Sequence, residues 1–130
     1  MSVLTKGAGG SAPKADLLWT NPSPTASFAA QTVSLNLSSY RYVVVTTNLS
    51  TSNSQANGYG IGKVGASYDT CMGTKSWDSA NSRMNANIRR FRASATGVQF
   101  YGGGYSTAES SNGKVIPYRI YGIKEDLGIL

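Results

Sequence analysis

Apolar and polar residues alternate with a period of two along much of the chain. The clearest example is residues 31–37, QTVSLNL, in which valine or leucine stands at every second position. Residues two apart lie on the same face of a β-strand, so this stretch predicts a strand with one buried and one solvated face. Residues 41–48, RYVVVTTN, are apolar on both faces at their centre. They predict a strand near the middle of a sandwich.

Several other short segments have the same strand-like composition. They are residues 16–20, 59–72, 84–94, 97–107 and 115–124. Tyrosine and β-branched residues favour pleated surfaces, whereas the glycine, serine and asparagine between the segments favour turns. No segment carries a sustained apolar stripe at helical spacing, although one helical turn around residues 74–80 stays open. We predict an all-β fold, a single antiparallel β-sandwich of jelly-roll type with about eight strands.

Two glycine-rich segments, GYGIG and YGGGY, superficially resemble phosphate loops. They occupy residues 58–62 and 101–105. Neither introduces a helix, which a phosphate loop needs to direct its backbone donors, so we interpret both as bends or sites of close subunit contact. The second also fits a hairpin arm that runs into a glycine-rich turn.

The two ends of the chain are predicted to meet. A chain of 130 residues fits one domain, which we place at residues 15–130. Terminal strands of a sandwich commonly lie side by side, so Trp19 would cover the same core edge as Tyr118 or Tyr121. Pro117 has no N–H to donate and therefore belongs at a sheet edge or at a bulge.

The composition argues against an enzyme. The chain has no histidine, so the commonest general base and the usual catalytic triads are missing. Asp69 and Asp78 form the only central carboxylate pair, and aspartate in turns more simply bonds the backbone. Cys71 is the only cysteine and is expected in the core. We expect no metal, no cofactor and no membrane span, and without a secretory signal we expect synthesis in the host cytoplasm.

Twelve basic residues against six acidic ones give a net charge of +6, which attracts anionic partners in general. The strongest basic run is RRFR, which contains Arg89, Arg90 and Arg92. Alternation puts Arg90 and Arg92 on one face of a strand and Arg89 beside Phe91 on the other. The run predicts either an anionic contact or arginine stems that cover a sheet. Tyrosines near arginine also fit a nucleic-acid surface, but no known motif supports one, so we do not expect nucleic acid as a partner.

Two further segments are candidate contact sites. Residues 1–14 mix glycine, alanine, serine and proline with Lys6 and Lys14, which predicts a flexible N-terminal arm for attachment. Residues 48–57 and 70–82 are polar and predict exposed loops able to bind a ligand such as a sugar. The candidate ligand residues are Asn53, Asn57, Asp69, Lys75, Trp77 and Asp78.

The two ends carry motifs that resemble a known module. They are LWTN at residues 18–21, FAAQT at 28–32, YVVV at 42–45 and IPYRIYG at 116–122. In this order they are similar to the β-sandwich module of tail-associated and other structural proteins of tailed bacteriophages. The resemblance covers roughly forty residues and leaves the middle of the chain unmatched. Its motifs belong to the framework and bring no catalytic or binding residues.

The resemblance implies a virion protein. We expect a fibre, tail or capsid decoration component that forms a homotrimer and contacts other virion proteins. Related modules usually stand at the end of a longer fibre or tip protein, whereas here the module is nearly the whole chain. This departure favours a small decoration, fibre or adaptor role over receptor binding. The alternative is a module that binds a host cell-surface glycan through its loops.

Overall fold

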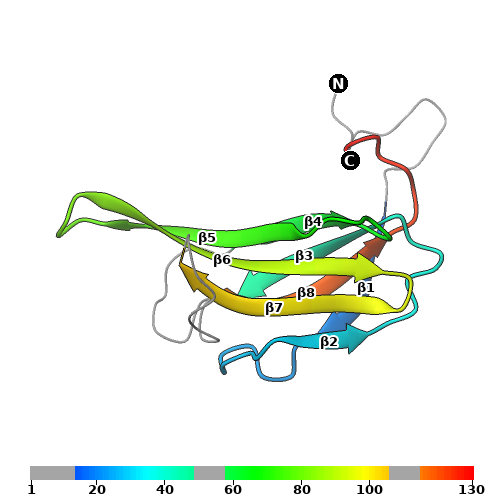
Figure 1. Ribbon diagram of the computed structural model, residues 1–130, viewed down its shortest axis with the longest axis horizontal. Coiled ribbons are helices and arrows are strands. Elements are labelled where there is room, and N and C mark those ends of the chain that lie inside the picture. The colour runs from blue at the N-terminus through cyan, green and yellow to red at the C-terminus, as the bar shows by residue number, and fades with distance from the viewer. Residues whose placement is uncertain (1–13, 49–57, 106–114) are drawn as a thin grey trace.

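The computed structural model describes residues 14–48, 58–105 and 115–130, and within these it is all-β (Figure 1). Eight strands form two antiparallel sheets of four, which confirms the predicted sandwich. What we call the terminal sheet has the order β1 (Ala15–Thr20), β8 (Ile116–Ile123), β3 (Tyr42–Asn48) and β4 (Tyr59–Lys63). The middle sheet has the order β2 (Gln31–Ser34), β7 (Gly97–Tyr105), β6 (Arg83–Ser94) and β5 (Thr70–Asp78).

The core lies between the two sheets and is built from their inward-facing residues, together with Phe28, Leu37 and Val115 from the connections. Its fully or nearly fully buried members are Phe28, Leu37, Val43, Val45, Met72, Phe91, Ala93, Val98, Phe100, Val115, Ile116 and Ile120. Trp19 packs at its margin, with ring centroids 6.2 Å from Phe28 and 6.4 Å from Phe100. Each aromatic pair adds about 0.5–1.5 kcal/mol beyond the area it buries.

The first and last strands pair directly, as predicted, but with an irregular register. Leu17 pairs with Tyr121 and Trp19 with Ile120, so Leu18 is an extra residue in β1. Such a bulge shifts which face the following residues occupy. Leu18 and Trp19 both pack against the core, whereas Leu17 is 55% exposed. Trp19 therefore faces inward while Tyr121 faces outward, and the predicted shared core edge is wrong.

Pro117 lies inside the sheet, because β8 is flanked by β1 and β3. The register with β3 slips here, since Thr46 pairs with Arg119 and Thr47 with Pro117. Asn21 follows β1 and donates its backbone N–H to the Tyr118 carbonyl (2.7 Å) and its side-chain amide to the Pro117 carbonyl (2.8 Å). The bulge alternative is confirmed and the edge alternative is wrong.

The glycines of β4 allow the sheets to approach closely. A Cβ added to Gly60 would lie 2.9 Å from the Phe91 ring, and one added to Gly62 would lie 2.6 Å from it. Real Cβ atoms do not make such contacts, so only glycine fits above this buried ring. These glycines make room for a side chain of the facing sheet, and the predicted contact with another subunit at residues 58–62 stays a prediction.

Three local predictions are wrong. Residues 70–78 form one continuous strand rather than a loop or a helical turn, because they pair throughout with β6. The run YGGGY continues β7, because Gly103 and Gly104 keep their pairing with β6. Cys71 is exposed, because its neighbour Met72 takes the inward position on β5.

The sandwich has two distinct ends. Ala15 pairs with Ile123, so β1 begins where β8 ends, and we call this end the terminal pole. Asn48 pairs with Ile116 at the opposite end. There the β5–β6 hairpin projects beyond the other strands (Figure 1), because β7 joins β6 only at Asn87. We call this end the hairpin pole.

Candidate functional site

The three arginines of the basic run divide between the two faces of β6, as the alternation predicted. Arg89 lies on the inner face with Phe91 and is 0% exposed. The side chains of Arg90 and Arg92 lie on the outer face and are 40% and 41% exposed. The run therefore has two separate roles, one inside the sandwich and one on its surface.

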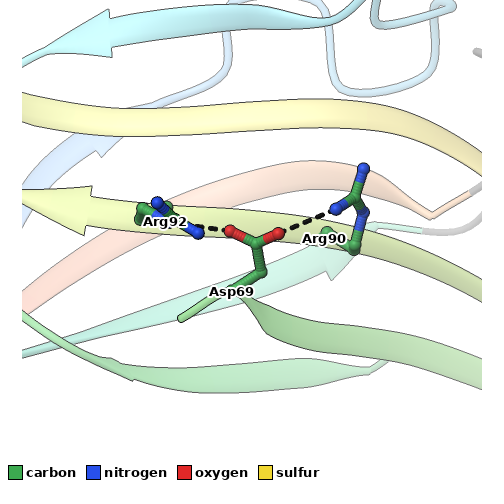
Figure 2. A network of polar contacts seen from close by, with 3 residues as sticks. All are labelled: Asp69, Arg90 and Arg92. Carbon is green, nitrogen blue, oxygen red and sulfur yellow. Dashed lines mark hydrogen bonds and ion pairs between the residues drawn. The ribbon is translucent and has the colours of Figure 1, made fainter. Parts of the chain in front are cut away.

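Asp69 stands between the two outer arginines (Figure 2). Its Oδ2 accepts a 2.7 Å hydrogen bond from Arg90 Nη1, and its Oδ1 accepts a 2.8 Å bond from Arg92 Nε. Arg90 also lies over the ring of Tyr101, 4.2 Å from its centroid. One carboxylate thus compensates part of two positive charges, and this surface is less attractive to an external anion than the sequence suggested.

Arg89 is a structural tie rather than an anion contact. Its Nε donates to the Val115 carbonyl at 2.9 Å, and its Nη1 donates to the Tyr101 carbonyl at 2.6 Å. The guanidinium carbon lies 5.5 Å from the Phe28 ring centroid. Val115 has a φ of 50°, an uncommon value for a β-branched residue, immediately before β8. Arg89 holds this carbonyl from the facing sheet, so its charged group is unavailable to a polymer or another subunit.

The predicted ligand residues do not form one site. Asp69 precedes β5 near the terminal pole, whereas Lys75, Trp77 and Asp78 lie on the projecting end of β5. At about 3.3 Å per residue, Asp69 and Asp78 stand roughly 30 Å apart along the strand, too far to act as paired carboxylates. Asn53 and Asn57 lie outside the described residues, as does Lys6 of the arm. Lys14 is exposed just ahead of β1.

Two further carboxylates bond tyrosine hydroxyls near the terminal pole. The Tyr40 hydroxyl donates to Asp16 (2.9 Å), and the Tyr42 hydroxyl donates to Asp126 (2.7 Å). These hydrogen bonds are the main cause that raises the pKa of each tyrosine. The bond from Tyr42, followed by one from the Gly128 N–H, lowers the pKa of Asp126. Asp16 and Asp126 are therefore committed to structural contacts.

A shallow hollow of about 400 Å³ lies on the outer face of the terminal sheet. We call it the tyrosine groove, and its wall includes Val44, Thr46, Tyr59, Tyr118, Arg119 and Tyr121. Strand pairing brings these residues together, since Thr46 faces both Tyr59 and Arg119, and Val44 faces Tyr121. Sequence reasoning missed this groove, because it expected Tyr118 or Tyr121 to cover the core edge. The only available signal was the alternation in β3, which turns Val44 and Thr46 away from Val43 and Val45.

Among residues 14–48, 58–105 and 115–130, no three histidine, cysteine, aspartate or glutamate side chains gather in a way that could hold a metal ion. The same residues contain no helix that is long and apolar enough to cross a membrane. Comparison with family models, curated proteins and solved structures found no match to this chain.

Proposed function

We propose that the chain is a structural β-sandwich module of a tailed-bacteriophage particle, attached to a capsid or tail component through residues 1–14. The resemblance at both ends of the sequence motivates the proposal. Three of the resembling segments, at residues 18–21, 42–45 and 116–122, lie on or directly after β1, β3 and β8. These strands are neighbours in the terminal sheet, which supports a framework role for the motifs.

The arrangement of the two poles carries the proposal. Lys14 leads into β1 at the terminal pole, and residues 124–130 follow β8 at the same pole. The β5–β6 hairpin projects from the opposite pole (Figure 1). A module held at the terminal pole would therefore present its hairpin outward. Binding through the arm would also leave both sheets and the core unchanged, as an adaptor or decoration role requires.

Deletion of residues 1–14 tests this attachment. We expect particles to assemble without the truncated protein, while circular dichroism of the purified variant keeps its β-sheet signal. Replacing Lys6 and Lys14 with glutamine in the full-length chain is the matched control, because it removes the charge and keeps the arm. Undiminished occupancy of the truncated protein on particles, measured by electron microscopy, would refute arm-mediated attachment. Assembly as a homotrimer stays a prediction, and sedimentation of a strictly monomeric species would contradict it.

The alternative function, glycan binding through the predicted loops, has less support in that form. Asp69 is engaged by two arginines and lies far along β5 from Trp77 and Asp78. The tyrosine groove is a better-formed candidate for a ligand, and it lies outside both loops that the sequence predicted to bind one.

A further inference from the structure

The tyrosine groove has the shape and composition of a small-molecule site. Ligand sites are concave, have volumes of roughly 300–1,000 Å³, and combine apolar or aromatic walls with a few polar groups. This groove measures about 400 Å³. Tyr59, Tyr118 and Tyr121 supply aromatic surface, and Tyr59 is 66% exposed. Thr46 and Arg119 supply the polar groups.

Arg119 differs from Arg90 and Arg92 because its charge lacks a carboxylate partner in the described part of the chain, and from Arg89 because its Nε has no carbonyl acceptor there. Its guanidinium carbon lies 4.4 Å from the Tyr118 ring centroid. Its backbone N–H and carbonyl bond Thr46 Oγ1 at 3.2 Å and 3.5 Å, but these contacts do not use the side chain. Its Nε is buried and has no hydrogen-bond acceptor among residues 14–48, 58–105 and 115–130. Native proteins leave few such donors unsatisfied, so this one calls for an explanation.

We propose that the tyrosine groove binds an anionic saccharide, a sugar ring that carries a carboxylate or a phosphate group. The apolar C–H face of the sugar stacks on the exposed tyrosine rings, which present large rigid surfaces with a polar hydroxyl at one end. The anionic group pairs with Arg119, whose guanidinium fork matches carboxylate and phosphate geometry. The net charge of +6 favours approach of such a ligand.

The location of the groove agrees with this proposal. Tyr59 begins β4 and Thr46 lies near the end of β3, so the groove lies towards the hairpin pole. A chain anchored at the terminal pole would leave this end accessible. The binding proposal does not require that anchoring, because it depends only on the groove residues and can be tested on the purified protein.

The test compares three sugars in titrations of the ¹⁵N-labelled full-length chain followed by NMR. Glucuronic acid carries a carboxylate, glucose 6-phosphate carries a phosphate, and glucose carries neither. We expect the two anionic sugars to shift the amide signals of Thr46, Tyr59 and residues 118–121, and to bind more tightly than glucose. The anionic sugar that binds more tightly then shows whether the natural ligand is an acidic polysaccharide or a phosphate-bearing polymer.

Two variants test the charge pairing and the ring stacking separately, each with a matched control. Arg119→Gln should weaken the anionic sugars about tenfold and leave glucose unchanged, because it removes a charge-assisted hydrogen bond. Tyr59→Ala should weaken all three about three- to tenfold, because it removes a stacking surface from an edge strand. Arg41→Gln and Tyr68→Ala change exposed residues that do not line the groove and should leave binding unchanged.

Several outcomes would overturn the proposal. These are equal binding of all three sugars, absence of shifts at the groove, and unchanged affinity of the anionic sugars for Arg119→Gln. Groove signals that move with protein concentration alone would assign this face to contact between copies of the chain. Shifts confined to Arg90 and Arg92 would place the anion on the middle sheet instead.

Discussion

The arginine side chains of the two sheets have different interaction partners. On the middle sheet, Arg90 and Arg92 share Asp69, and Arg89 donates to two backbone carbonyls inside the sandwich. On the terminal sheet, Arg119 stacks on a tyrosine ring and has no carboxylate partner among the described residues. The same residue type is therefore fixed internally on one sheet and available on the other. This difference favours the terminal sheet as the surface that meets an anionic partner.

The carboxylates of the terminal sheet explain the difference. Asp16 on β1 and Asp126 after β8 both accept hydrogen bonds from tyrosine hydroxyls near the terminal pole. Arg119 lies in the first half of β8, directly after Pro117 and Tyr118 and away from the terminal pole. No acidic residue occurs between Val115 and Lys124, so β8 itself offers no charge partner. The sheet thus uses its acids to hold the chain ends and leaves its groove basic.

The largest expected effect comes from the buried arginine. Arg89→Met keeps an apolar stem of similar length but leaves the carbonyls of Val115 and Tyr101 without the donors from Arg89. We expect the free energy of unfolding to fall by about 2–4 kcal/mol, since each unsatisfied buried acceptor costs about 1–3 kcal/mol. Urea denaturation followed by circular dichroism measures the change.

Arg92→Met is the matched control for Arg89→Met, because the same substitution is made on the same strand at a side chain that is 41% exposed. We expect it to cost less than about 1 kcal/mol, as exposed ion pairs do. Equal losses for the two variants would contradict the assignment of Arg89 as the structural tie.

A smaller effect is expected at Asp69. Asp69→Asn keeps the shape of the side chain but removes the negative charge that Arg90 and Arg92 share. We expect a stability loss of about 1 kcal/mol or less, because both arginines are well exposed. The middle sheet should then gain binding of glucose 6-phosphate, seen as NMR shifts around residues 90–92. If the variant binds no more phosphate than the parent, internal pairing is not what keeps this face from binding anions.

Much of the architecture was predictable, because the alternation of apolar and polar residues shows which face of a strand each side chain occupies. The period of two placed Arg89 on the opposite face from Arg90 and Arg92, and it identified β3 as a strand. The strand predicted over residues 31–37 is shorter, because β2 ends at Ser34 and only Leu37 beyond it is fully buried.

The prediction failed where one residue is inserted. Leu18 is the extra residue of β1, and both Leu18 and its neighbour Trp19 pack against the core. Tyr118 is the extra residue of β8 relative to β3. Tyr121, expected at the core edge, faces outward because Ile120 takes the inward position.

The contacts of the candidate sites were less predictable, because they depend on which strands become neighbours. Asp69 stands more than twenty positions before its arginine partners, and only the β5–β6 pairing brings them together. The tyrosine groove likewise requires β8 to lie beside β3 and β3 beside β4. Neither neighbour relation follows from local composition, so sequence reasoning found the residues without their partners.

Arg119→Gln tests the difference between Arg119 and Arg89, because its effect on the stability of the fold should be slight. The side chain makes no ion pair that the structure describes, and its guanidinium lies over the Tyr118 ring. We expect the free energy of unfolding to change by about 0.5 kcal/mol or less, far less than for Arg89→Met. Chemical denaturation of the two variants side by side measures the difference. A large loss for Arg119→Gln would show that Arg119 supports the fold and would weaken its assignment to a ligand.

The smallest expected effect is a pH response at the chain end. The bond from Tyr42 lowers the pKa of Asp126, so the ionised carboxylate is favoured in the folded chain. Its stabilisation is present above the unfolded pKa of about 3.9 and is lost as the pH falls through the lowered folded value. The NMR titration midpoint of the Asp126 carboxyl carbon should therefore lie below the ordinary value and rise in Tyr42→Phe. Tyr40→Phe is the matched control, because its hydroxyl bonds Asp16 instead. An equal midpoint in Tyr42→Phe and the parent would show that Tyr42 does not hold the Asp126 carboxylate. This carboxylate would then be available to pair with the basic side chains of the terminal sheet in place of an external anion.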